Sequence, residues 1–272
     1  MMLHDNERQW SLQLKEAFQN CEDFDDDFHT NMTDLSLAQH AIVSHGNVTE
    51  ALERIEGLQR FFGEYGIDHT PEQGLYYVTE FMKQQPGYVL HVDVSVVTQQ
   101  AWLVTDSAAF QVKQALASDE QWKICICGIY YLHYCQWTTL AAIRQGLICE
   151  IECDSVGWHN FNMEFVPRLF GELFTYIPIK YQMMRAYNTN VVANLLFSLA
   201  RPFMNTSQKE SVKLGCQVVL NNNDAPPMTG SGVRRLSEFY LQPNLEVATQ
   251  RILQRVECLL KQRKQNELEF RI

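Results

Sequence analysis

Residues 176–204 form the most informative stretch of the chain, YIPIKYQMMRAYNTNVVANLLFSLARPFM. Pro178 leads into a predicted strand at Met183–Tyr187, and Asn188-Thr189-Asn190 separates that strand from a predicted helix at Val191–Ala200. This helix carries more apolar surface than a helix with one buried face requires. We therefore expect it to cover an apolar surface or molecule.

The surrounding sequence predicts helices and strands in alternation. Apolar residues recur at three- and four-residue steps over the first third, which is typical of helices, and after Pro86-Gly87 the period becomes that of strands. The other predicted strands are Val89–Val94, Ala101–Thr105 and Leu147–Cys153, and the other predicted helices of this part are Ser107–Ala117, Asp119–Ala142, Phe161–Phe174 and Asn244–Lys264. This alternation predicts an α/β fold with a mainly parallel sheet and right-handed crossovers.

The order of these motifs resembles the CRAL-TRIO lipid-binding family, which includes cellular retinaldehyde-binding, tocopherol-transfer and phosphatidylinositol-transfer-like proteins. The family core reads roughly Tyr-Pro-x-Arg/Lys, strand, Asn-x-Pro, apolar helix, Lys-Pro-Phe-Leu, and residues 176–204 follow that order. Cys153–Trp158 is similar to the family strand that ends in Asp-x-x-Gly, and Ala225–Ser231 is similar to its Leu-Pro-x-Glu-Tyr-Gly-Gly turn. Residues 34–67 resemble the small helical domain that precedes the fold.

The resemblance implies a bowl with a mainly parallel sheet as its floor, an apolar cavity and a helical gate, preceded by a small all-α domain. The predicted domains are residues 1–85 (helical), 86–233 (lipid-binding) and 234–272 (a C-terminal amphipathic helix packed on the second). The implied function is non-catalytic binding and intracellular transfer of a hydrophobic molecule, with no cofactor. Candidate ligands are a retinoid, tocopherol, sterol, carotenoid or phospholipid, exchanged at a membrane surface.

Two patterns predict which residues line the cavity: the alternation of side chains along the strands and the apolar face of the helix. The candidates are Trp102, Val104, Cys149, Ile151, Cys153, Met184, Ala186, Leu195, Leu196, Phe197, Leu199 and Phe203. Placing Cys149 and Met184 toward the cavity puts Glu150, Glu152 and Arg185 together on the other face, since side chains alternate along a strand.

Three lysines are candidates for contact with a lipid headgroup or membrane: Lys180, Lys209 and Lys213. Ile179 follows Pro178 where phosphoinositide-binding relatives carry a charged residue, which makes a less polar ligand at least as plausible. An adaptor or regulatory module with a vestigial pocket is the alternative function.

Composition narrows the class of protein. A net charge of −10 argues against a general nucleic-acid binder. Eight cysteines in 272 residues are too few for a disulfide scaffold, and the N-terminus lacks the apolar region of a secretory signal. We therefore expect reduced thiols and a cytoplasmic protein that is peripheral to membranes. The sequence gives no indication of the oligomeric state.

The motifs for catalysis are weak. Gly230-Ser231-Gly232 lacks the third glycine and the preceding strand of a dinucleotide fingerprint. Glu150 and Glu152 could act as an acid and base pair, but Arg185 is a plausible ion partner for them. Cys125 and Cys127 lie two apart in a helical pattern and so point different ways, and Cys149 and Cys153 lack partnering histidines nearby, so no metal site is predicted. With no catalytic motif either, an enzyme is not predicted.

Overall fold

The computed structural model describes residues 2–204, 206–216, 236–241 and 244–272. The N-terminal helices are α1 (Asp5–Gln19), α2 (Asp26–Asn31), α3 (Asp34–Val43), α4 (Val48–Tyr65) and α5 (Pro71–Gln84). The helices between the strands are η1 (Ser107–Ala109), α6 (Val112–Ala115), α7 (Asp119–Tyr134), α8 (Leu140–Gln145), η2 (Trp158–Asn160), α9 (Phe165–Leu169), η3 (Phe170–Phe174), α10 (Val191–Ala200), η4 (Arg201–Phe203) and α11 (Thr206–Ser211). The C-terminal helices are α12 (Leu236–Tyr240) and α13 (Leu245–Glu269).

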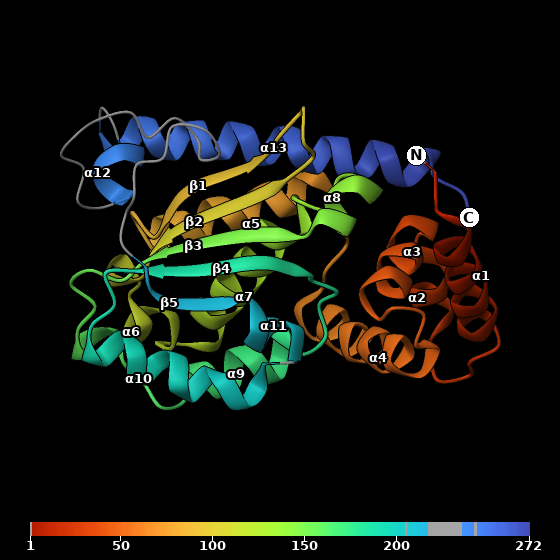
Figure 1. Cartoon of the computed structure of the whole chain (residues 1–272), viewed down its shortest axis with the longest axis horizontal. Helices are drawn as coiled ribbons and strands as arrows, with labels where there is room; N and C mark the ends of the chain where they lie inside the picture. The colour runs from red at the N-terminus through yellow and green to blue at the C-terminus, as the bar shows by residue number, and fades with distance from the viewer. Residues whose placement is uncertain (1, 205, 217–235, 242–243) are drawn as a thin grey trace.

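A five-stranded sheet forms the centre of the molecule (Figure 1). Its strands are β1 (Val89–Val94), β2 (Ala101–Asp106), β3 (Leu147–Glu152), β4 (Tyr181–Tyr187) and β5 (Val212–Cys216), in the spatial order of the chain. β1 pairs with β2 antiparallel, and all the later pairs are parallel. The predicted α/β class with a mainly parallel sheet is confirmed, as is the N-terminal helical region.

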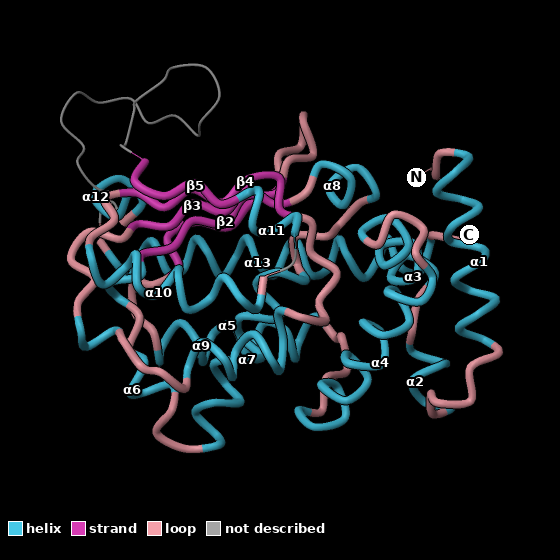
Figure 2. The backbone as a smooth tube through the Cα atoms, turned by 60° about the horizontal axis from the view of Figure 1, so that its bottom comes forward, coloured by secondary structure: helices cyan, strands magenta, loops and turns pink. Residues whose placement is uncertain are grey.

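Helices cover one face of the sheet in a continuous layer. Figure 2 shows α7, α9 and α10 on the same side of the strands. On the opposite face, Leu236 and Tyr240 of α12 pack on Leu90, Val104 and Tyr187. β2 and β3 are mostly buried on both faces, which is the usual condition of parallel strands, whereas the stretch Gln182–Arg185 of β4 stays partly exposed.

The C-terminal helix α13 lies along the β1 edge and packs on α5. Arg255 of α13 donates to Asp93 of β1 through Nε at 2.6 Å and to the carbonyl oxygen of Val94 at 2.9 Å. An uncovered strand edge is prone to pair with other chains, and α13 covers this one. At its other end, the guanidinium of Arg263 bonds the carboxylate of Glu267 at 2.9 Å and the hydroxyl of Ser36 at 3.1 Å, which ties α13 to α3.

The N-terminal helices have a small core of their own. Its buried members are Leu14, Phe18, Phe24, Phe28, Leu37, Ala41, Ala51 and Ile55. Arg144 of α8 joins this region to the sheet through the buried carboxylate of Glu7, with an Nε to Oε1 distance of 2.8 Å. The division into residues 1–85, 86–233 and 234–272 stays a prediction, and its second boundary lies outside the described residues.

Two predicted helices differ from the structure. The segment predicted as one helix over Asp119–Ala142 is α7 and α8, because Thr139 adopts an extended conformation and caps the nitrogen of Ala142. The segment 107–117 contains only the short η1 and α6, because the carboxylate of Asp106 caps Ala108 and the chain is extended again at Phe110.

Candidate functional site

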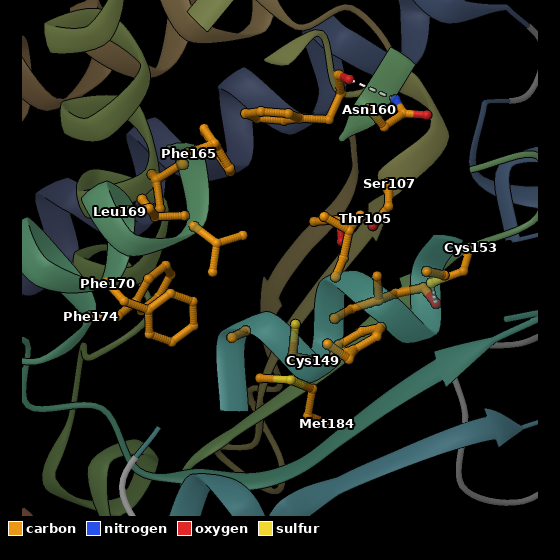
Figure 3. Close-up of a pocket in the computed structure, with 18 of the residues that line it drawn as sticks. Thr105, Ser107, Cys149, Cys153, Asn160, Phe165, Leu169, Phe170, Phe174 and Met184 are labelled. Atoms are coloured by element: carbon orange, nitrogen blue, oxygen red, sulfur yellow. Dashed lines mark hydrogen bonds between the residues drawn. The ribbon is translucent and has the colours of Figure 1, made fainter. Parts of the chain in front are cut away.

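A cavity of about 230 Å³ lies between the sheet and the helices beneath it. Its lining is mostly apolar and comes from β2, β3 and β4, from α7, from the α9–η3 segment and from α10. The close-up in Figure 3 shows Cys149 and Met184 on one side of the empty space and Phe165, Leu169, Phe170 and Phe174 on the other.

The strand register explains the floor of the cavity. Cys149 of β3 pairs with Leu103 of β2 and with Met184 of β4, while Thr105 pairs with Ile151. Paired residues in a sheet point to the same face, so these five side chains line one surface. The thiol of Cys149 is buried there, and burial raises its pKa to about 12, which makes it unreactive.

The gate candidate α10 closes one side of this space. Its cavity-lining residues are Ala193, Leu196, Phe197 and Ala200, spaced as one face of a helix. Asn190 caps the helix by accepting from the nitrogen of Ala193 at 3.0 Å, and its amide donates to the carbonyl oxygen of Val156 at 2.7 Å. The start of α10 is therefore held to the loop that follows β3.

The structure brings six of the twelve predicted lining residues to the cavity: Cys149, Ile151, Cys153, Met184, Leu196 and Phe197. Ala186 is buried on the same side of the sheet but packs against Val192 and Ala193 of α10. Leu195, Leu199 and Phe203 lie outside the lining; the Leu195 and Phe203 side chains are exposed and that of Leu199 is half-buried. Whether any of them binds a ligand stays a prediction.

The placement of Trp102 and Val104 in the cavity is wrong. Both lie on the opposite face, in the cluster with Leu90, Leu236 and Tyr240. β2 is buried on both faces, so its alternation does not reveal which face meets the cavity. The cavity face carries Leu103 and Thr105 instead.

Most residues of the cavity wall carry no sequence signal that assigns them to a cavity. The unpredicted lining residues are Tyr88, Leu103, Thr105, Ser107, Phe110, Val112, Ile129, His133, Val156, Asn160, Phe165, Val166, Leu169, Phe170, Phe174, Tyr181, Ala193, Ala200 and Met204. The amphipathic pattern of Phe161–Phe174 was a usable signal, because its apolar face had to meet either the core or the cavity. Choosing between those two needs the tertiary arrangement.

The polar residues in the cavity are almost all paired with protein groups. The Asn160 amide nitrogen donates to the carbonyl oxygens of Ala108 and Phe110 at 3.1 and 2.8 Å, and its oxygen accepts from the nitrogen of Gly157 at 2.9 Å. His133 hydrogen-bonds through Nδ1 to the carbonyl oxygen of Ile129 at 2.8 Å. Burial lowers the pKa of His133 to about 4.

The two carboxylates of β3 lie on the face away from the cavity. Glu150 accepts from Arg185 and from the hydroxyl of Tyr187, each at 3.0 Å, so its predicted ion pair with Arg185 is confirmed. Glu152 is fully buried and accepts from the amide nitrogens of Cys153 and Asp154, from the side chain of Asn188 and from the nitrogen of Leu236. Both acids therefore have structural partners. Glu150 links β3 to β4, and Glu152 binds the segments that follow β3 and β4 and the start of α12.

The three candidate lysines lie away from the cavity lining. Lys180 precedes β4 and donates to the carbonyl oxygen of Arg144 at 2.7 Å. Lys213 of β5 is exposed and pairs in register with Arg185, so it belongs to the far face of the sheet, and Lys209 is exposed on α11. Their contact with a headgroup or membrane stays a prediction. The turn at Ala225–Ser231 and the Gly230-Ser231-Gly232 motif lie outside the described residues.

Among the described residues, no helix is both long and apolar enough to span a bilayer. Within these residues, no three side chains of His, Cys, Asp or Glu come together as metal ligands would.

Comparison with known proteins gives a structural likeness without a sequence match. No protein-family model matches the chain, and no curated protein matches its sequence. Its structure is similar to the crystal structure of Sfh5, with a TM-score of 0.49 and 11% sequence identity over 79% of this chain and 82% of that chain. Membership of the CRAL-TRIO family stays a prediction from the motifs.

Proposed function

We propose that this protein binds one hydrophobic small molecule or lipid in the cavity beneath the sheet, without catalysis, and exchanges it at a membrane surface. The observation that carries the proposal is an apolar cavity of about 230 Å³ closed on one side by a helix, α10. Burying each methylene of a ligand contributes about 0.8 kcal/mol, so ten carbons contribute on the order of 8 kcal/mol before the costs of association. Escape into water would be slow, and exchange at a membrane removes that barrier.

The outer side of the gate region supports contact with lipid. Val191 and Leu195 of α10 and Phe203 of η4 are exposed, with 79%, 37% and 41% of their surface accessible. Trp158 and Met163 are exposed on the loop that Asn190 ties to α10. Apolar side chains on the outside of a helix enter the headgroup region of a bilayer, and a tryptophan favours that region.

Native mass spectrometry of the purified protein, with extraction and identification of any co-purifying molecule, tests the binding step. A stoichiometric hydrophobic ligand would support the proposal and name its class. A ligand-free mass, together with no uptake from liposomes, would contradict it and favour the adaptor module with a vestigial pocket.

A matched pair of variants tests the membrane step. Val191→Asp with Leu195→Asp changes exposed residues of α10 that are outside the cavity lining. Val96→Asp with Val97→Asp is the control, and it changes two exposed apolar residues in the turn between β1 and β2. We expect transfer between liposomes to fall about tenfold or more for the first pair only, because a buried charge opposes insertion into the bilayer. Equal transfer rates for the two pairs would contradict the gate assignment.

A further inference from the structure

The hydrogen-bonding side chains that line the cavity restrict the class of ligand that can bind there. None of the described residues that line the cavity is Lys, Arg, Asp or Glu. The hydroxyl of Tyr88 lies within interaction reach of the Thr105 side chain, and the thiol of Cys153 within reach of the Ser107 side chain. Asn160 uses both amide hydrogens and its oxygen within the protein. Among the described lining residues, His133 and Tyr181 stand out, because Nε2 of His133 and the hydroxyl of Tyr181 have only one long contact between them, at 3.5 Å.

These two side chains face each other across a gap. The hydroxyl of Tyr181 lies 3.5 Å from Nε2 of His133, well beyond the usual 2.7–2.8 Å of a hydroxyl hydrogen bond. Both side chains are more than nine-tenths buried, with 6% and 5% of their surface accessible. The ring of Phe174 meets His133 edge-on, with centroids 5.4 Å apart, and so fixes the plane of the imidazole.

The protonation of His133 follows from its other bond. A carbonyl oxygen only accepts, so the contact of Nδ1 with Ile129 places the proton on Nδ1 and leaves a lone pair on Nε2. Burial keeps the imidazole neutral at physiological pH. This pair of side chains therefore offers an acceptor, Nε2 of His133, and a donor, the hydroxyl of Tyr181.

We propose that the cavity takes a single-chain apolar molecule ending in a neutral hydroxyl group, which donates to Nε2 of His133 and accepts from the hydroxyl of Tyr181. A hydroxyl uses both groups, whereas an ether or carbonyl uses only the donor. A carboxylate or phosphate would lose its hydration with no cation in the lining to replace it. The volume of about 230 Å³ is below the 300–1,000 Å³ of typical ligand sites, which favours one chain over a two-chain phospholipid.

This inference rests on the proposed function, and three matched probes test it. Dodecan-1-ol, 1-methoxyundecane and dodecanoate have nearly the same length, and their affinities can be measured at pH 7.5 by displacement of diphenylhexatriene. We expect the alcohol to bind about tenfold tighter than the ether, which cannot donate to His133, and tighter than the carboxylate. The order of the three affinities for the wild-type protein tests the inference by itself, even if a variant fails to fold.

Two tyrosine variants test whether the hydroxyl of Tyr181 contacts the ligand. Tyr181→Phe removes one hydroxyl from the cavity, and Tyr77→Phe removes one from a buried tyrosine outside the lining. We expect Tyr181→Phe to lower affinity for the alcohol about tenfold and Tyr77→Phe to leave it unchanged. Equal binding of alcohol and ether, tighter binding of dodecanoate, or equal effects of the two variants would overturn this inference and leave the proposed binding function standing. Failure of all three probes to bind would overturn this inference, whereas the proposed function is overturned by a ligand-free mass together with no uptake from liposomes.

Discussion

Filling the cavity by mutation separates an internal binding space from ordinary core packing. Ala200 lies on the cavity face of α10 and is buried. The change Ala200→Phe adds six carbons to that face. In a close-packed core such an insertion costs about 1–3 kcal/mol of stability, because neighbouring side chains must move. In a cavity of about 230 Å³ the ring has space to enter.

The expected change in the free energy of unfolding is the gain from burying the added ring minus the costs of placing it. Six carbons at about 0.8 kcal/mol each set an upper limit of about 5 kcal/mol, and imperfect fit to an existing wall leaves roughly half of it. Lower helix propensity and loss of rotamers remove about 1–1.5 kcal/mol. We expect the free energy of unfolding of the ligand-free protein to rise by about 1 kcal/mol, with uptake of dodecan-1-ol reduced at least tenfold.

Urea denaturation followed by circular dichroism gives the stability, and native mass spectrometry gives the uptake. Ser198→Phe places the same ring on the exposed side of α10 and serves as the control, with uptake retained. A loss of more than about 1 kcal/mol from Ala200→Phe, combined with wild-type uptake, would refute the reasoning, because the ring would then be crowded and the ligand held elsewhere.

Three further predictions concern buried ionisable groups. Glu267→Gln should destabilise the protein by about 3–5 kcal/mol in urea, because it leaves the buried guanidinium of Arg263 uncompensated, whereas the double change Arg263→Met and Glu267→Leu should cost far less; similar losses would contradict this account. Glu150→Gln should lower stability by about 1–3 kcal/mol and leave ligand uptake unchanged, and a loss of uptake without a loss of stability would point to a functional carboxylate. Burial lowers the pKa of four histidines: to about 3 for His40, to about 4 for His69 and His133, and below its ordinary value for His91. Their unfolded pKa is about 6.5, so the unfolded chain binds more protons and stability should fall as the pH drops from about 6.5 toward 4, by about 1.4 kcal/mol per pH unit for each histidine; urea midpoints that stay constant between pH 7 and 5 would contradict it.

The sequence by itself was sufficient for the class of fold and for one side of the candidate site. The change from helical to extended periodicity after Gly87 predicted the sheet, and the excess apolar surface of residues 191–200 predicted a covering helix. Such local patterns can be predicted from the sequence because helices and strands each impose a characteristic spacing on their apolar residues. The same logic paired Glu150 with Arg185, since neighbouring parallel strands bring equivalent positions together.

Only the tertiary structure decided which face of each element meets the cavity. Trp102 and Leu103 are adjacent, both faces of β2 are buried, and the sequence contains no sign of which covering layer leaves a space. His133 and Tyr181 are 48 residues apart, and no motif links them, so their meeting depends on how α7 packs against β4. A cavity is defined by what several elements fail to fill, and that property belongs to their packing and not to any one segment.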